Sequence, residues 1–248
     1  MNTISILLVD DHSIVRAGLR ALLETAGDMQ VIGEAEDGRQ AVQETKRLRP
    51  QVVLMDFAMP LLNGVEAARQ IALEVATARV LILSSYSDDL HLRQAVSAGA
   101  AGFLTKESAA ADLLEAIRET HKGGAFFSPR LLYQLLMEWR KELAAGGDGT
   151  TQAPTLPMRQ AQVLQLVAEG YANKQIAELL SVSMKTVEKH RQALMVRLDC
   201  HNTARLTGYA VASGAVEVRS IPNGAPSWPA LGSRWCGENA VPNRRADE

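Results

Sequence analysis

The sequence contains little cysteine and no long apolar run. Its 248 residues include two cysteines, Cys200 and Cys236, which stand far apart. Such usage predicts reduced thiols and argues against a disulfide framework or a cysteine metal site. No apolar stretch approaches the length that crosses a bilayer, and no basic flank or cleavage site accompanies the first one. We therefore expect a cytoplasmic protein that does not enter a membrane.

A large excess of either charge is also missing. The chain has 26 Lys and Arg against 28 Asp and Glu, a net charge of −2. Residues 1–123 hold 12 basic against 17 acidic side chains, whereas residues 154–218 hold 7 against 5. The later part is thus mildly basic, which alone does not establish nucleic-acid binding. Apolar content of 47% and charged content of 22% are typical of a globular protein of one or two domains.

Apolar runs of strand length alternate with helical patterns over residues 1–123. The runs are rich in β-branched residues, as expected of strands buried on both faces of a parallel sheet. This alternation predicts an α/β fold, a doubly wound sheet of five parallel strands with right-handed crossovers. We expect Ser13 to cap the first helix and the third helix to begin near Asn63. The predicted strands are residues 4–9, 30–35, 52–56, 80–83 and 102–105.

Polar residues follow four of these strands directly. Asp10 and Asp11 end the first strand, Asp56 the third, Ser84 the fourth and Lys106 the fifth. Because the carboxyl ends of parallel strands meet at one edge of a sheet, we expect all five residues at a single site. Helix capping would explain any one of them, but not an acidic triad, a hydroxyl and a lysine together.

The residue types at this edge indicate phosphoryl chemistry. Three clustered carboxylates repel one another and need a cation, and oxygen ligands in a partly hydrated site suit Mg²⁺. A carboxylate beside Mg²⁺ can attack a phosphoryl group and become an aspartyl phosphate. Lys106 and the hydroxyl of Ser84 can supply donors to the phosphoryl oxygens.

Residues 1–123 resemble the receiver domain of bacterial two-component response regulators, a flavodoxin-like fold. The resemblance rests on Leu8-Val9-Asp10-Asp11, Met55-Asp56 with Met59-Pro60, Leu83-Ser84 and the stretch 99–106. It implies that Asp56 accepts phosphate from a sensor histidine kinase with the help of Lys106. It also implies a switch pair, Ser84 and Phe103, whose ring follows the hydroxyl inward. The implied Mg²⁺ ligands are Asp10, Asp11, Asp56 and the carbonyl of Ala58.

Residues 124–153 are expected to connect two domains, because an amphipathic pattern from Leu131 to Trp139 precedes a flexible-linker composition from Ala144 to Thr151. The segment that follows carries no strand signal and predicts helices at 158–169, 174–180, 184–198 and 203–212. The second and third of these have helix-turn-helix proportions, with Asn173 and Ser183 as expected caps.

The third of these helices has two distinct sides. Val187, Leu194 and Leu198 share one side. The other side combines lysines that suit phosphates with an amide that can read a base edge, namely Lys185, Lys189, Gln192 and Val196. On helix pattern alone, an ordinary solvated face is the better interpretation.

Three motifs favour DNA binding over a merely solvated face. They resemble the DNA-binding domain of NarL/FixJ (LuxR-type) regulators and comprise Leu164 to Gly170, Asn173 to Ala177 and Lys185 to His190. The resemblance implies binding to double-stranded promoter DNA and a homodimer, when phosphorylated, through the fourth helix. Two features depart from the family: residues 156–160 lack the usual first cap and its acidic partner, and Gly208 interrupts the fourth helix. The implied DNA-contacting residues are Lys185, Thr186, Glu188, Lys189, Arg191 and Gln192.

These features together predict a transcription regulator that phosphorylation activates, with the receiver limiting access to the DNA-binding domain beforehand. The expected parts are a receiver at 1–123, a linker at 124–153, a DNA-binding domain at 154–216 and a tail at 217–248 of disordered composition. One alternative, a phosphatase of the haloacid-dehalogenase type, would need a second acid where Ala58 stands. The other, a phosphorylation-independent DNA or partner binder with a vestigial receiver, is disfavoured because all five receiver residues are present.

Overall fold

The computed structural model describes residues 3–85, 89–127, 133, 137, 156–200 and 202–216. The predicted flexible linker and tail lie outside the described residues, as does the linker helix apart from two positions. Among the described residues, no helix is long and apolar enough to cross a membrane.

The first part of the chain folds into a parallel sheet of six strands, in the order β2-β1-β3-β4-β5-β6. The order reverses direction between β1 and β3, which is where sheets of this kind bind ligands. The strands are β1 Ile4–Val9, β2 Met29–Ala35, β3 Val52–Asp56, β4 Arg79–Ser84, β5 Gly102–Thr105 and β6 Phe126–Phe127. The helices are α1 Ser13–Thr25, α2 Gly38–Leu48, α3 Gly64–Glu74, α4 Asp89–Ser97 and α5 Ala110–His121.

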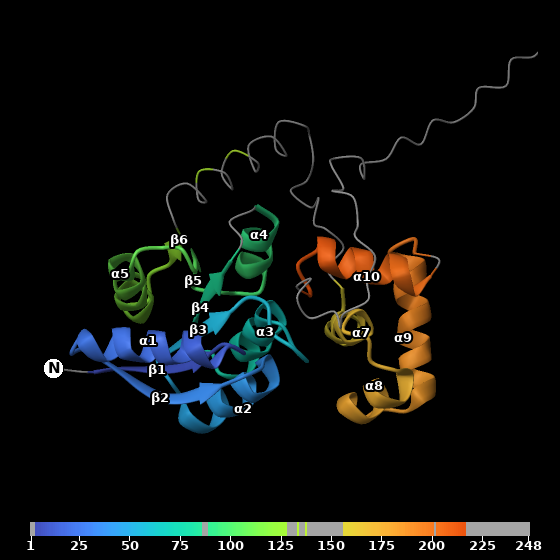
Figure 1. Ribbon diagram of the computed structural model, residues 1–248, viewed down its shortest axis with the longest axis horizontal. Helices are drawn as coiled ribbons and strands as arrows, with labels where there is room; N and C mark the ends of the chain where they lie inside the picture. The colour runs from blue at the N-terminus through green and yellow to red at the C-terminus, as the bar shows by residue number, and fades with distance from the viewer. Residues whose placement is uncertain are drawn as a thin grey trace, which may run out of the picture.

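Alternating side chains of the central strands supply two separate cores. In β1, Leu7 and Val9 belong to the core formed with α2, α3 and α4, whereas Ile6 and Leu8 belong to the core formed with α1 and α5. Helices therefore cover both faces of the sheet, as Figure 1 shows. The doubly wound α/β fold predicted from the alternation is confirmed.

Two details of that prediction are wrong. The count of five strands misses β6, in which Phe126 and Phe127 pair in parallel with β5. Two residues are too few to produce a strand pattern that a sequence reader can detect. Ser13 is the first helical residue of α1 and not its cap, because no side chain caps that helix. Asn63 does cap α3, since its side-chain oxygen accepts from the backbone N–H of Glu66 at 2.9 Å.

The second part of the chain is helical. It contains α7 Met158–Ala168, α8 Asn173–Leu180, α9 Met184–Arg197 and α10 Thr203–Ala212, close to the predicted bounds. Ser183 caps α9 as expected, accepting from the N–H of Thr186 at 3.1 Å. Asn173 does not cap α8 but begins it, and its side chain accepts from Arg191 instead. One core joins the four helices, with Val163, Leu166, Ile176, Val187, Leu194 and Leu206 at its centre.

The helical domain lies against the edge of the sheet domain at the carboxyl ends of the strands. In Figure 1, α7 faces α3 and the end of α10 lies near α4, whereas α9 stands on the side away from the sheet. Hydrogen bonds span the junction at several points. Arg39 of α2 donates to the carbonyl of Leu179 at 2.8 Å, and Gln94 of α4 donates to the carbonyl of Ser213 at 2.8 Å.

Candidate functional site

The carboxyl ends of β1, β3, β4 and β5 bring the predicted site residues to one edge. Asp10 and Asp56 are buried there, Asp11 is exposed beside them, and Ser84 is fully buried at the end of β4. The loop after β3 returns tightly, because the N–H of Gly64 donates to the carbonyl of Phe57 at 2.8 Å. A Cβ atom on Gly64 would lie 2.1 Å from the carbonyl oxygen of Asp56, so this return requires glycine.

Lys106 is the cation that joins the two buried carboxylates. Its Nζ lies 2.9 Å from Asp10 Oδ2 and 2.9 Å from Asp56 Oδ1. Burial opposes its charge, but the negative charges of Asp56 and Asp10 outweigh that cost and raise the pKa of Lys106. The ammonium group is therefore held charged where negative charge collects.

The acidic cluster fits the Mg²⁺ ion that the resemblance implies. Ligand atoms of Asp10, Asp11, His12 and Asp56 all lie within 4.8 Å of one another. Carboxylate oxygens are the hard donors that Mg²⁺ prefers. His12 Nδ1 lies 2.8 Å from Asp11 Oδ1, so the imidazole is paired with the carboxylates. The carbonyl of Ala58 belongs to the loop that follows directly after Asp56.

Phe103, the aromatic member of the implied switch pair, lies inside the sheet domain. Its ring is 0% exposed and makes an edge contact with Phe57, with ring centroids 6.5 Å apart. Phe57 follows Asp56 directly and contacts His91 of α4, with centroids 4.5 Å apart. The ring of Phe103 therefore occupies an inward position already in this structure.

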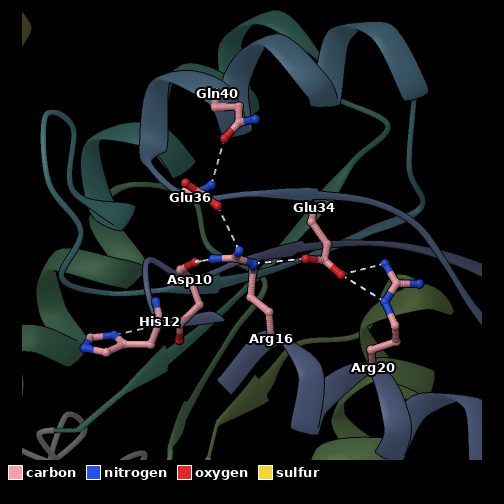
Figure 2. A network of polar contacts seen from close by, with 7 residues as sticks. All are labelled: Asp10, His12, Arg16, Arg20, Glu34, Glu36 and Gln40. Atoms are coloured by element: carbon pink, nitrogen blue, oxygen red, sulfur yellow. Dashed lines mark hydrogen bonds and ion pairs between the residues drawn. The ribbon is translucent and has the colours of Figure 1, made fainter. Parts of the chain in front are cut away.

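Arg16 is a residue of this site that the sequence did not indicate. Its guanidinium is buried and donates to the carbonyl of Asp10 at 2.7 Å, to Glu34 at 3.0 Å and to Glu36 at 2.9 Å, as Figure 2 shows. Arg20 bonds the same Glu34, and this bond, opposed by desolvation, lowers the pKa of Glu34. The network anchors the end of β1 to the end of β2. The role of Arg16 could have been predicted only if its burial on α1 had been known, and the sequence pattern does not show that burial.

The predicted recognition helix, α9, presents its polar side to solvent. Lys185, Lys189, Gln192 and Val196, hereafter the recognition face, are all exposed, Val196 by 80%. Lys189, Gln192 and Val196 also line a hollow between α9 and Gln160 of α7. Val187 and Leu194 on the other side are buried, as the helical angle predicted.

The remaining predicted DNA contacts differ in their surroundings. Glu188 is exposed, whereas the hydroxyl of Thr186 lies 2.8 Å from that of Ser183 at the cap of α9. Arg191 is engaged within its own domain, because it donates to the side chains of Asn173 and Thr203 at 2.9 Å each. Its guanidinium therefore braces the starts of α8 and α10 against α9.

Comparison with known proteins identifies both parts of the chain. A model described as the response regulator receiver domain matches residues 6–118, and one described as bacterial regulatory proteins, luxR family, matches residues 154–210. The transcriptional regulatory protein LiaR of Bacillus subtilis is 37% identical over 207 residues, which cover 84% of this chain and 96% of LiaR.

Solved structures agree with this assignment. The RcsB response regulator of Salmonella typhimurium is 25% identical and superposes with a TM-score of 0.59, over 86% of this chain and 99% of that one. A structure of RcsB dimers on DNA is 25% identical with a TM-score of 0.51, over 86% of this chain and 99% of that one.

A parallel α/β domain with an acidic strand edge, followed by a helix-turn-helix domain, defines a class of transcription regulators and not of enzymes. The chain belongs to the two-component response regulators with a LuxR-type DNA-binding domain. The sheet domain is accordingly called the receiver below.

Proposed function

We propose that this chain is activated by phosphorylation of Asp56 and then regulates transcription at promoter DNA. The observation that carries the proposal is the position of Asp56, buried at a strand end with Lys106 2.9 Å from its carboxylate and Asp10 beside it. The chain would act in the cytoplasm, with a sensor histidine kinase as the phosphoryl donor. Its parts would be the receiver 1–123, linker 124–153, DNA-binding domain 154–216 and tail 217–248.

The residues present suit phosphoryl transfer to a carboxylate. A carboxylate oxygen of Asp56 attacks phosphorus, and the bond between phosphorus and the donor imidazole nitrogen breaks. The electron pair of that bond stays on the nitrogen, which takes up a proton. Lys106 and the Ser84 hydroxyl would donate to the transferred oxygens. Mg²⁺ held by Asp10, Asp11, Asp56 and the Ala58 carbonyl would neutralise charge on the phosphoryl group.

The recognition face supports the DNA-binding half of the proposal. Its lysines suit phosphates and Gln192 suits a base edge, with Thr186, Glu188 and Arg191 on the same helix. RcsB is described as forming dimers bound to DNA, and a homodimer of the phosphorylated chain on paired half-sites is proposed by analogy. Ser84 and Phe103 would carry the phosphorylation signal within the receiver.

Replacement of the phosphoacceptor tests this function. Asp56→Asn should abolish labelling by a small phosphodonor with Mg²⁺, because an amide is no nucleophile here, whereas Asp112→Asn on the exposed start of α5 should be labelled like the parent. Label retained on Asp56→Asn would reject the assignment. An unlabelled parent that still binds promoter DNA would favour a phosphorylation-independent DNA binder.

A further inference from the structure

The turn between β1 and α1 carries two of the implied Mg²⁺ ligands, Asp10 and Asp11, which are held very differently. Asp10 is 1% exposed, and its N–H donates to the carbonyl of Ala35 at 3.2 Å. Its carboxylate accepts from the N–H of His12 at 2.8 Å and from Lys106 at 2.9 Å. Asp11 is exposed and is paired with the ring of His12, which is exposed too. The direction of the Asp11 carboxylate therefore depends on the backbone from which it projects.

Arg16 holds that backbone at the peptide bond between the two aspartates. The carbonyl group of Asp10 belongs to this peptide unit, and because the unit is planar, a bond to its oxygen sets the orientation of the whole unit. Nη1 of Arg16 donates to that oxygen at 2.7 Å, and the backbone N–H of Arg16 donates to the carbonyl of His12 at 3.1 Å. Both the side chain and the backbone of Arg16 are thus tied to the turn that carries Asp11.

Two glutamates at the end of β2 hold the guanidinium group of Arg16 in place. Nε donates to Glu34 at 3.0 Å and Nη2 donates to Glu36 at 2.9 Å, so each of the three nitrogens of the planar group has one partner (Figure 2). The two glutamates are two residues apart, a spacing that puts both on one side of a strand. A lysine, with a single ammonium group, could not reproduce this fork.

The same network supplies position without adding net charge to the site. Two arginines face two glutamates, since Arg20, one turn after Arg16 on α1, donates to Glu34 at 2.6 Å. A lone positive charge beside the acidic cluster would repel a Mg²⁺ ion. The two glutamates offset that repulsion and leave the bond from Arg16 to Asp10 intact. Arg16 therefore acts on the acidic cluster through geometry.

We propose that Arg16 is a positioning residue of the phosphoacceptor site, which holds the peptide unit between Asp10 and Asp11 so that both carboxylates are directed at Mg²⁺. Arg16 acts through these two ligands and is not a ligand itself. Loss of a residue that orients metal ligands commonly costs about ten- to a hundredfold in metal affinity. The inference rests on the proposed function of the site, in which Mg²⁺ serves phosphoryl transfer to Asp56.

Replacement of Arg16 tests this role through the sign of the effect. Loss of a positive charge alone would tighten the binding of Mg²⁺, whereas loss of positioning would weaken it. In the full, unphosphorylated chain, Arg16→Met should raise the Kd for Mg²⁺ about tenfold, measured by calorimetric titration with magnesium chloride alone. Arg20→Met is the matched control, because it removes the other arginine of the network but no bond to Asp10. It should keep the Kd of the parent.

Arg16→Lys is a second variant, which keeps the charge and removes the fork, and its Kd should rise in the same direction. Both variants should keep the circular dichroism spectrum of the parent, because Glu34 retains Arg20 and Glu36 is exposed to solvent. A Kd within about twofold of the parent in either folded variant, or a tighter Kd in Arg16→Met, would overturn the proposal. Loss of the fold in both would also overturn it, since Arg16 would then stabilise the domain and not the site.

Labelling by acetyl phosphate provides an independent readout. Arg16→Met should need about tenfold more Mg²⁺ for half-maximal labelling, and its rate should fall more at low Mg²⁺ than at saturating Mg²⁺. An equal fall at both concentrations would contradict positioning through the metal ligands. A parent that binds Mg²⁺ but takes no label would reject the proposed function of Asp56, while the Kd values would still decide the role of Arg16. A parent that binds no Mg²⁺ would reject both.

Discussion

The position of Lys106 and of the other residues at the strand ends could be predicted from the sequence. Asp10, Asp56, Ser84 and Lys106 meet because each ends a strand of one parallel sheet, which a strand pattern predicts. Arg16 and its partners Glu34 and Glu36 were not predictable in this way. Their contacts depend on the angle at which α1 crosses the sheet, and no strand end marks them.

The charge of Lys106 gives the first prediction. Lys106→Met should lower the rate of labelling by about 10²-fold, because one positioned donor to the phosphoryl oxygens is lost. The chain should remain folded by circular dichroism. Lys122→Met, an exposed lysine of the same domain, should be labelled like the parent. A rate for Lys106→Met within a factor of two of the parent would contradict this role.

The same lysine predicts a dependence of stability on alkaline pH. Its pKa in the folded chain is raised above 10.5, so its stabilising contribution is complete below that pH and is lost as pH rises through the raised pKa. The melting temperature of the parent should therefore exceed that of Lys106→Met by a constant margin from pH 7 to 9. The margin should shrink only above about pH 10.4, the usual pKa of lysine.

Glu169 gives a prediction for the dependence of stability on acidic pH. Burial raises its pKa above 4.5, although Gln165 and the N–H of Leu61 partly stabilise the charge. The protonated carboxyl group therefore contributes to folding stability below pH 4.5, and this contribution is lost as pH rises through the raised pKa. Glu169→Gln keeps an acceptor for Leu61 without the buried charge. It should therefore melt higher than the parent at pH 7, and the difference should vanish towards pH 4.

At the scale of single helices, α9 makes a prediction that separates affinity from specificity. Lys189→Ala should weaken binding to all DNA and reduce the salt slope by about one unit, as expected for a phosphate contact. Gln192→Ala should instead relax preference at one base position by about 1–3 kcal/mol. Fluorescence anisotropy over a salt series, with Lys122→Ala as control, measures both. If both variants keep the affinity and the base preference of the parent, DNA does not bind at the recognition face.

The docking of the two domains belongs to the whole molecule, and the sequence could not foretell it. Gln162 and Gln165 fall on α7 where a helix pattern treats polar residues as solvated, yet both are buried. Gln165 is buried where surfaces separated by about a hundred residues of sequence meet, as in the bond from the N–H of Asn63 to Gln165. The expectation that the receiver limits access to the DNA-binding domain stays a prediction, and the exposed recognition face does not test it.

The exposure of the recognition face leads to the last prediction, which asks whether the docked receiver hinders the binding of DNA to the helical domain. If docking leaves that face accessible, the unphosphorylated parent and Gln165→Ala should bind a duplex carrying one half-site with affinities within about twofold, less than 0.5 kcal/mol. If the receiver instead masks the DNA-binding domain, the parent must separate its two domains before it binds DNA, and this separation costs free energy. Gln165→Ala would avoid that cost and should bind at least about tenfold tighter. Binding to a single half-site avoids any contribution from dimer formation. A tenfold gain would therefore mean that the receiver hinders DNA even though α9 faces away from it.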